Sequence, residues 1–323
     1  GVVYSHSHVD HFGGVRGVVD EADVASGKVM VIAPEGFMSA AIEENVFAGN
    51  AMSRRSQWQY SVLLPRGPLG HVDQAIGKNI ANGNTGLIAP NRFIKGDFEE
   101  ITLDGVKMVF QNVPDTEAPV EMNTYFPQFK TLWSSELVTG TIHNIYTVRG
   151  APVRNALNWS KEINNTLWKC GQEAEVIFAS HSWPRWGNAR IQEVLRAQRD
   201  AYANLNNQAL HYANQGVTIN QIQNVYEVPN SLQQQWAARS YHGDVQNNAR
   251  AVLNRFLGFY DANPVNLHPL SPEDSAPLYV EMMGGSAKIM AKGQQLLDQG
   301  KYLEASEILN KLMLAESRNM PAR

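Results

Sequence analysis

The sequence lacks cysteine pairs and long apolar runs. Its 323 residues include one cysteine, Cys170, which excludes an internal disulfide and leaves the redox compartment open. No stretch approaches the roughly 20 apolar residues of a membrane-spanning helix, and no signal-peptide pattern is present. The chain starts at Gly1, already inside an apolar run, so we expect further sequence upstream, where any targeting segment would lie.

Clustered basic residues are also absent. Lysine and arginine number 27 against 31 acidic residues, which gives a formal net charge of −4. Binding to a nucleic-acid backbone needs clustered positive charge, so the composition argues against a nucleic-acid partner. The remaining composition, 43% hydrophobic and 18% charged, is ordinary for a globular protein, and the length allows two domains.

One motif near the N-terminus stands out against this background. His6, His8, Asp10 and His11 form H-x-H-x-D-H directly after the apolar run at 2–4, which predicts a strand followed by a tight loop. Imidazole nitrogens and carboxylate oxygens are ligands that zinc and similar divalent ions take. Four of them so close together can hardly all face one tetrahedral ion, so the motif predicts two metal ions that share the loop.

The first part of the chain alternates between predicted strands and helices, which indicates an α/β arrangement. The predicted strands are 29–34, 101–103, 106–111, 122–126, 131–134 and 176–179, and the predicted helices are 35–60 and 152–169, with Pro152 in the first turn of the latter. Between them, residues 63–92 are rich in Gly, Asn and Pro and predict a long loop. Loops of this length in compact domains are usually functional.

Three titratable residues lie just after the ends of predicted strands. Glu117 lies in a Pro-bounded loop, Glu136 follows Trp133, and His181 stands after the strand at 176–179. Strand ends in α/β proteins are where ligands are expected. Each glutamate alone is more often a surface carboxylate, and His181 alone is as often a buried structural histidine, so the residues themselves leave both interpretations open.

The character of the sequence changes near residue 187. Strand signals nearly vanish, and helical periodicity dominates the segments 191–215, 219–225, 231–238, 245–260 and two helices within 278–313. This predicts a division into a catalytic domain at 1–186 and a helical domain at 187–323. A helical domain beside an α/β catalytic domain commonly mediates association or covers the active site, and we expect both.

With these residues and the segments HNIYTVRGAPVRNALNWSKEIN and ASHSWPRWGN, the chain resembles the class III alkyl sulfatases of the metallo-β-lactamase superfamily. The resemblance implies an α+β fold, in which a metallo-β-lactamase-type αββα sandwich precedes an all-α dimerisation domain, and it implies a homodimer. It also implies a periplasmic or secreted location. Family members carry an N-terminal portion that completes the sandwich and a C-terminal sterol-carrier-like domain, and we expect both to be missing from this chain.

The resemblance also implies a reaction and a ligand set. Two Zn²⁺ ions would activate water to hydrolyse alkyl sulfate esters, such as dodecyl sulfate or secondary alkyl sulfates, with attack at sulfur or at carbon both open. His6, His8 and Glu117 would hold one zinc. Asp10, His11 and His181 would hold the other, and Glu136 would bridge the two.

Other residues are candidates for contact with the substrate. Arg149 is the first candidate for binding sulfate oxygens, because a guanidinium matches two oxyanion oxygens, although it could equally cap a turn. Asn82 and Asn84 are candidates as neutral donors. His143 and His242 are candidates for protonating the leaving group, because histidine titrates near neutral pH, and a structural role is as plausible for each.

An alkyl tail needs an apolar channel. Five residues could line one, although such residues more often belong to a plain core: Trp183, Trp186, Phe37, Met38 and Met52.

The sequence disfavours three alternatives to an alkyl sulfatase. A β-lactamase or thioesterase of the same fold is disfavoured by the two glutamates and the large helical region. A di-iron redox protein is disfavoured by His8, because such proteins usually carry a glutamate there. An assembly module with structural zinc is disfavoured because structural sites are usually closed and often contain thiolates.

Overall fold

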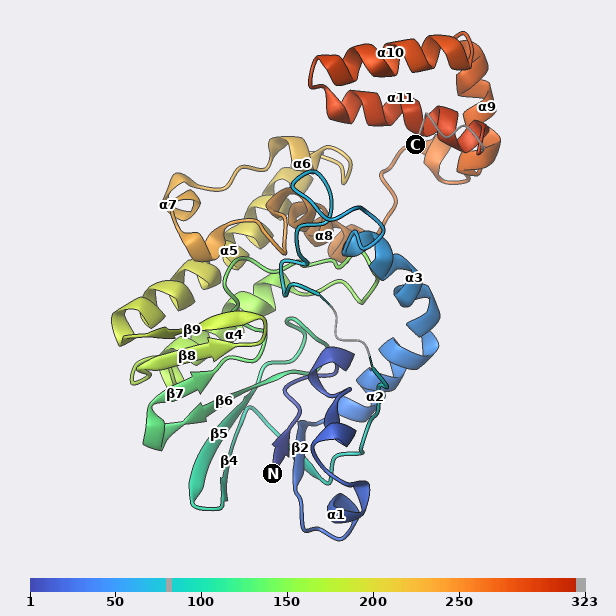
Figure 1. Cartoon of the computed structure of the whole chain (residues 1–323). Helices are drawn as coiled ribbons and strands as arrows, with labels where there is room; N and C mark the ends of the chain where they lie inside the picture. Colours follow the sequence, from blue (N-terminus) through green and yellow to red (C-terminus); the bar gives the residue numbers. More distant parts are fainter. Residues whose placement is uncertain (80–82, 318–323) are drawn as a thin grey trace. The chain divides into compact units, whose positions relative to one another are not determined.

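The computed structural model of the chain describes residues 1–79 and 83–317, and the chain forms two compact units, Gly1–Phe259 and Tyr260–Arg323 (Figure 1). No helix in this described part is long and apolar enough to cross a membrane. The first unit contains two β-sheets and most of the helices.

The smaller sheet is parallel, with the order β1-β2-β3. Its strands are β1 (Val2–Val3), β2 (Val31–Pro34) and β3 (Arg92–Ile94). The helices that accompany it are α1 (Glu21–Ala25), α2 (Phe37–Ile42), the π-helix η3 (Glu43–Phe47) and α3 (Gly49–Gln59). The predicted strand at 29–34 and the helical segment at 35–60 are thus confirmed, the latter in three pieces.

The larger sheet has six strands in chain order, β4 to β9, antiparallel except for the parallel pair β7–β8. The strands are β4 (Phe98–Leu103), β5 (Val106–Asn112), β6 (Met122–Phe126), β7 (Thr131–Trp133), β8 (Val176–Ala179) and β9 (Ser182–Trp186). β9 was not predicted from the sequence. Pro184 has no N–H to donate, which is tolerated here because β9 is an edge strand.

The two sheets pack face to face. Side chains alternate between the faces of a strand, so Ile32 of β2 points toward the larger sheet while its neighbours Val31 and Ala33 point the other way. Ile32 belongs to a buried cluster with Met108 and Phe110 of β5. Val31 and Ala33 instead pack with the residues of α2. The result is the predicted αββα order of layers.

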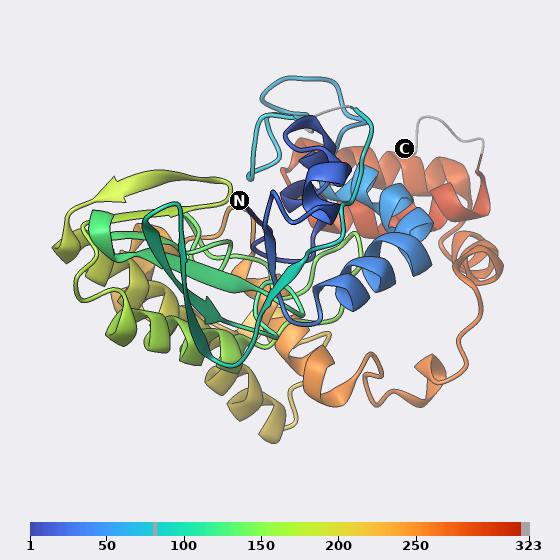
Figure 2. The same cartoon turned by 90° about the horizontal axis from the view of Figure 1, so that it is seen from below.

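Helices α4 (Ala156–Lys169) and α5 (Asn188–Asn214) cover the other face of the larger sheet, as Figure 2 shows from below. The prediction that Pro152 lies in the first turn of α4 is wrong. The helix begins four residues later because Asn155 caps it, with its side chain accepting a hydrogen bond from the Asn158 N–H at 3.1 Å. Trp159 of α4 is fully buried and donates to the Leu137 carbonyl at 2.7 Å.

The helices after α5 share this core. α6 (Ile222–Val225), α7 (Asn230–Gln233) and α8 (Val245–Leu257) contribute buried residues to the same cluster as α4 and α5. The domain boundary predicted at residue 187 therefore does not coincide with the division between the compact units, and it stays a prediction. The second unit consists of α9 (Pro272–Met282), α10 (Ser286–Asp298) and α11 (Tyr302–Ala315) around Ile289 and Leu312.

The remaining short helices are of the 3₁₀ type: η1 (Val9–His11), η2 (Val15–Gly17), η4 (Pro127–Phe129), η5 (Trp236–Ala238) and η6 (Pro264–Asn266). Between α3 and β3 lies the long segment predicted as a loop. In its described residues, the pairing found is an isolated bridge between Arg66 and His71. η1 carries Asp10 and His11 of the His/Asp motif, and His6 and His8 lie between β1 and η1.

Candidate metal centre

Four chain segments meet at one edge of the sheets. β5 and β7 both run antiparallel to β6, and β7 is parallel to β8, so the carboxyl ends of β5, β7 and β8 lie at the same edge. Glu117, Glu136 and His181 follow these three strands. His181 has a φ of 62°, and Ser135 before Glu136 has a φ of 50°, both in the left-handed region that costs free energy for residues with a Cβ. The surrounding structure holds two site segments in strained turns.

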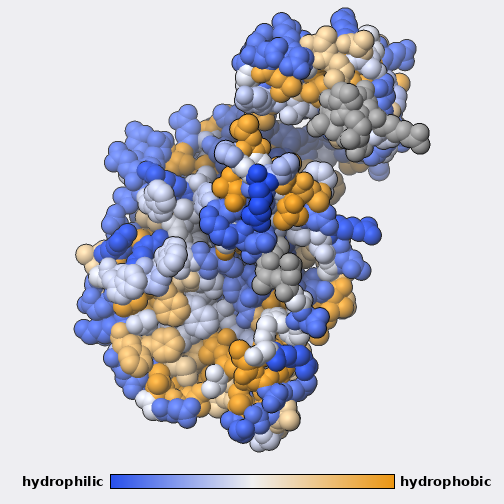
Figure 3. Space-filling view, viewed as in Figure 1, coloured by the Kyte–Doolittle hydropathy of each residue, from blue (hydrophilic) through white to orange (hydrophobic). Residues whose placement is uncertain are grey.

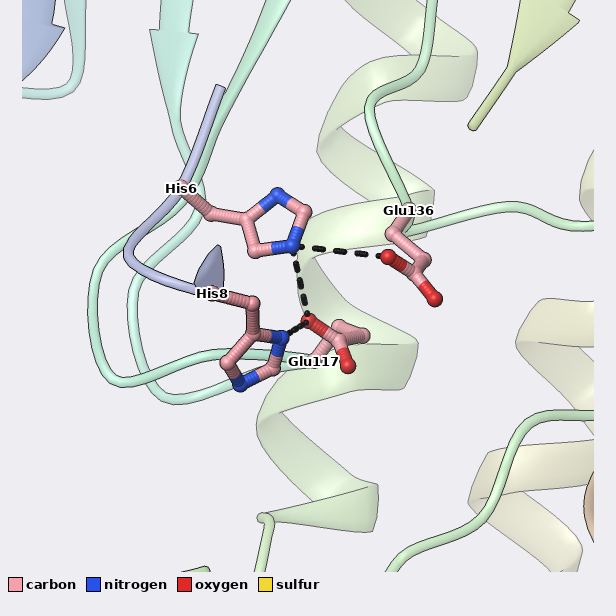
Figure 4. A group of neighbouring side chains, drawn as sticks. All are labelled: His6, His8, Glu117 and Glu136. Atoms are coloured by element: carbon pink, nitrogen blue, oxygen red, sulfur yellow. Dashed lines mark ion pairs between the residues drawn. The ribbon is translucent and has the colours of Figure 1, made fainter. Parts of the chain in front are cut away.

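His6, His8, Glu117 and Glu136 form the first group of converging side chains, all buried (Figure 4). Glu117 Oε2 lies 2.9 Å from His8 Nδ1 and 3.4 Å from His6 Nε2. Glu136 Oε2 also lies 3.4 Å from His6 Nε2. One ligand atom from each residue lies within 4.8 Å of the others.

Asp10, His11 and His181 form the second group. His11 Nε2 lies 3.2 Å from Asp10 Oδ2, and His181 Nε2 lies 3.1 Å from the same oxygen. Glu136 Oε2 lies 3.0 Å from His11 Nε2 and 3.6 Å from His181 Nε2. The same oxygen of Glu136 thus faces both groups.

The two groups have the chemistry and spacing of cation sites. His6 Nε2 and Glu117 Oε2 are buried atoms without a hydrogen bond. Such atoms are costly unless something else compensates them. Ligand atoms about 2.0–2.2 Å from one tetrahedral ion lie about 3.4 Å apart, close to the separations found here. The residues therefore fit divalent metal ions.

The charges of the two groups balance only through bound protons or bound cations. Burial lowers the pKa of His6 to about 4. Burial also disfavours charge on His11, but hydrogen bonds to Asp10 and Glu136 outweigh it and raise the pKa of His11 to about 11. Burial likewise opposes ionisation of Glu136, yet contacts with His11 and other histidines hold its pKa well below the ordinary value. Binding of a dication would displace these protons.

Polar groups lie behind three of the histidine rings, and two of these groups make hydrogen bonds to the ring. His6 Nδ1 lies 3.0 Å from Ser5 Oγ, and His181 Nδ1 lies 2.7 Å from the Ile76 carbonyl in the long loop. His8 Nε2 lies 3.3 Å from Glu44 Oε2. Such partners fix the tautomer and the orientation of a ligating ring.

A cavity of about 720 Å³ opens over the two groups. His143 lies in its wall, with Nε2 3.0 Å from Glu136 Oε1, and the ring of His242 packs edge-on against it at 4.6 Å. Gly243 permits this contact, because a Cβ there would lie 2.4 Å from the His143 carbonyl carbon. Both candidate proton donors therefore come together, although they are far apart in sequence.

Of the candidates for contact with the substrate, one lies in the cavity wall. Arg149 lines the cavity, with Nη1 2.5 Å from Glu44 Oε1 and 3.3 Å from Met52 Sδ. Asn84 is exposed and is not among the described residues that line the cavity, and Asn82 lies outside the described residues.

The five residues considered for an apolar channel are divided between the cavity, the core and the surface. Met52 lines the cavity, but Phe37 is fully buried among core residues and Met38 packs against the same cluster. Trp183 and Trp186 are 89% and 65% exposed on β9. Because β9 is an edge strand that the sequence analysis did not predict, the direction of its side chains could not be anticipated.

Sequence reasoning missed several buried residues of the site. Arg154 is 5% exposed and donates to a carboxylate oxygen of Glu117, to the Asn144 carbonyl at 2.9 Å and toward His143 Nδ1 at 2.9 Å. Glu44 was also missed. The motif R-x-x-x-x-R at 149–154 was a usable signal, because it offered two arginines where one was chosen.

Glu121 is a third missed residue. It is fully buried, its Oε1 accepts the Glu136 N–H at 2.8 Å, and its Oε2 lies 2.9 Å from the Thr116 hydroxyl. Burial, reinforced by the charge of Glu117, raises the pKa of Glu121 to about 8. The carboxyl group is therefore neutral below that pH, and the Thr116 hydroxyl donates to its Oε2.

We expect Glu121→Gln to stabilise the metal-free protein at pH 9 and to change little at pH 5. An unfolded glutamate ionises near its ordinary pKa, whereas the folded one keeps its proton until about pH 8. Folding therefore takes up a proton between these values, and stability falls as pH rises; the loss is on the order of a few kcal/mol. Glutamine keeps both hydrogen bonds without this loss. Thermal midpoints measured from pH 5 to 9 test this, and a difference that does not vary with pH would contradict it.

Sequence models of two protein families match the two ends of the chain. Residues 1–119 match the sequence model described as the metallo-beta-lactamase superfamily, and residues 218–323 match the one described as alkyl sulfatase dimerisation. The whole chain is 45% identical to an (R)-specific secondary-alkylsulfatase from Pseudomonas sp and covers 49% of it. It is 44% identical over its full length to an alkyl/aryl-sulfatase of Saccharomyces cerevisiae, of which it covers 50%.

A solved structure is also similar. The structure of a stereoselective inverting sec-alkylsulfatase from Pseudomonas sp. matches 99% of this chain with a TM-score of 0.96 and 44% identity. This chain covers 51% of that one. The chain thus spans about half the length of the relatives that it matches.

Proposed function

We propose that the protein hydrolyses alkyl sulfate esters to an alcohol and inorganic sulfate, because residues 1–119 match the metallo-beta-lactamase superfamily model and residues 218–323 match the alkyl sulfatase dimerisation model. The observation that carries the proposal is the pair of ligand groups that share Glu136 beneath a cavity lined by Arg149. Identity of 41% to a linear primary-alkylsulfatase, beside 45% to a secondary one, supports the substrate class without selecting between the two ester types.

The proposed cofactor is a pair of zinc ions. His6, His8 and Glu117 would hold one, Asp10, His11 and His181 would hold the other, and Glu136 would lie between them. When bound, the ions would supply Lewis-acid activation of water, whose pKa falls from about 16 toward 7. The absence of thiolate ligands and the open cavity over the groups support a catalytic rather than a structural role.

Arg149 is proposed to bind the sulfate group. Its side chain lines the cavity, and its planar guanidinium can donate to two oxygens of a tetrahedral oxyanion. The Glu44 carboxylate outweighs the effect of burial and keeps the pKa of Arg149 raised, so the guanidinium stays charged.

His143 and His242 are proposed to have different roles. His143 Nε2 lies 3.0 Å from Glu136, which favours a role in orienting that carboxylate. His242 is the proposed proton donor to the leaving oxygen. Burial and the neighbouring His143 lower the pKa of His242 to about 3, so its protonated ring is a strong acid that forms only a small fraction near neutral pH.

The test is hydrolysis of dodecyl sulfate and 2-octyl sulfate by the zinc-loaded, full-length protein in oxygen-18 water. We expect release of sulfate that stops when a chelator removes the metal. Label in the alcohol assigns cleavage to the C–O bond, and label in the sulfate assigns it to the S–O bond. No release of sulfate from either ester by protein that holds two metal ions per chain would overturn the proposed substrate class.

A homodimer is proposed through the helical region. The match of residues 218–323 to the dimerisation model supports it. The second unit also exposes large apolar side chains, which Figure 3 shows as orange residues on its visible face. Leu278, Met282 and Leu303 are 56%, 86% and 85% exposed. A monomeric mass by light scattering at micromolar concentration would contradict the proposal.

A further inference from the structure

Glu44 lies behind the first ligand group, on the π-helix η3 between α2 and α3 (Figure 1). π-Helical turns are rare and often occur at functional sites. Glu44 is 7% exposed, whereas its neighbour Glu43 is exposed. Asn45 of the same turn lies 3.5 Å from the Ser7 carbonyl, so η3 contacts the loop that carries the metal motif. The buried carboxylate of Glu44 therefore needs partners inside the protein.

The two oxygens of Glu44 face two different parts of the site. Oε1 lies 2.5 Å from Nη1 of Arg149, which lines the cavity. Oε2 lies 3.3 Å from Nε2 of His8 and makes no hydrogen bond. One carboxylate thus stands between a metal-ligand histidine and the proposed sulfate-binding arginine.

The two ring nitrogens of His8 determine what Glu44 can do. Nδ1 points to Glu117 and to the first ligand group, and the other nitrogen points away from it (Figure 4). A neutral imidazole that gives Nδ1 to a metal must carry its proton on Nε2. That nitrogen lies 3.3 Å from Glu44 Oε2, a buried oxygen that makes no hydrogen bond and is therefore free to accept the proton of Nε2. A carboxylate in this position fixes the tautomer and increases the basicity of a ligand.

We propose that Glu44 is a positioning residue that couples metal binding to sulfate binding, by accepting the His8 Nε2–H with one oxygen and holding the Arg149 guanidinium with the other. This inference rests on the proposed function for its sulfate part, whereas its metal part stands on the His8 geometry alone. A carboxylate can accept from both donors. A glutamine can accept from only one, because its amide nitrogen would face the other donor, and the acceptor that remains is a neutral oxygen, so both contacts weaken.

The test compares Glu44→Gln with Glu43→Gln, which changes an exposed carboxylate of the same turn. Release of zinc to a chromogenic chelator measures the metal part. We expect release about 10–100-fold faster for Glu44→Gln, as for loss of other partners behind a metal ligand, and no change for Glu43→Gln. Equal rates of release for Glu44→Gln and the unchanged protein would overturn the link to His8.

Hydrolysis of an alkyl sulfate at saturating zinc measures the sulfate part. We expect KM to rise about 10-fold or more for Glu44→Gln, and also for Arg149→Lys, which should keep normal zinc release. An unchanged KM in Glu44→Gln would overturn the link to Arg149. If the unchanged protein hydrolyses no alkyl sulfate, the proposed function fails, while the zinc-release comparison still tests the role of Glu44. Should Glu44→Gln not fold, Glu44→Asp replaces it, because its shorter carboxylate keeps the charge but does not reach both partners.

Discussion

Replacing Glu136 by glutamine is expected to lower hydrolysis of alkyl sulfates at least 100-fold and to reduce the metal content of the purified protein. The Oε2 atom of Glu136 lies 3.0 Å from His11 and 3.4 Å from His6, so it faces both ligand groups. An amide in this place offers a neutral oxygen where two cations would share an anionic one. Lewis-acid stabilisation is worth several kcal/mol, and each 1.36 kcal/mol is about tenfold in rate.

The measurement is metal content by mass spectrometry beside turnover of dodecyl sulfate. Glu175→Gln is the matched control, because Glu175 is exposed and precedes β8 without contributing to either ligand group. We expect this control to keep two metal ions per chain. Two ions retained in Glu136→Gln would refute a shared carboxylate between the groups.

Replacing Arg154 by methionine is expected to lower the unfolding free energy of the metal-free protein by about 3–5 kcal/mol, because one partner of a buried ion pair is removed. Arg154 and Glu117 are 5% and 2% exposed. Burial opposes ionisation of Glu117, and the charge of Arg154 is the main influence that holds the pKa of Glu117 low. Without Arg154, the carboxylate and the Asn144 carbonyl lose their buried donor.

Urea denaturation with and without zinc measures this effect. Zinc at the first ligand group would supply positive charge next to Glu117, so we expect the difference between the two proteins to shrink when zinc is bound. Arg54→Met, at an exposed position on α3, is the control and should change stability by less than about 0.5 kcal/mol. A loss of equal size with and without zinc would show that Arg154 does not compensate Glu117.

The sequence predicted most of the strands because apolar alternation and turn residues are local signals, whereas the order of the layers was implied by the family resemblance. The strand β2 and the hairpin of β4 and β5 follow directly from them, with Asp104 and Gly105 both at positive φ in the turn. β9 was not predicted because Pro184 and two exposed tryptophans do not give the alternating pattern of a half-buried strand. Only its position at the edge of the sheet makes that composition acceptable.

The site could be predicted in part for the same reason. The ligands between His6 and His11 are close in sequence, so one stretch shows that they could bind metal. The role of Glu117, Glu136 and His181 as ligands was implied mainly by the family resemblance. Glu44 and Arg154 could not be recognised because burial of a charge depends on partners distant in sequence. Arg154 contacts a residue 37 positions away, and Arg149 lies near Glu44 only through the packing of η3.

The large sequence separation of the ligands has a consequence for synthesis of the protein on the ribosome. His11 and His181 are 170 residues apart, yet their ring nitrogens lie 3.3 Å from each other. At about 5–20 residues per second, the first histidines leave the ribosome roughly 10–30 s before their partner is made. Throughout that interval the nascent chain presents three histidines and an aspartate without His181, so the second ligand group is complete only after the turn between β8 and β9 has been translated.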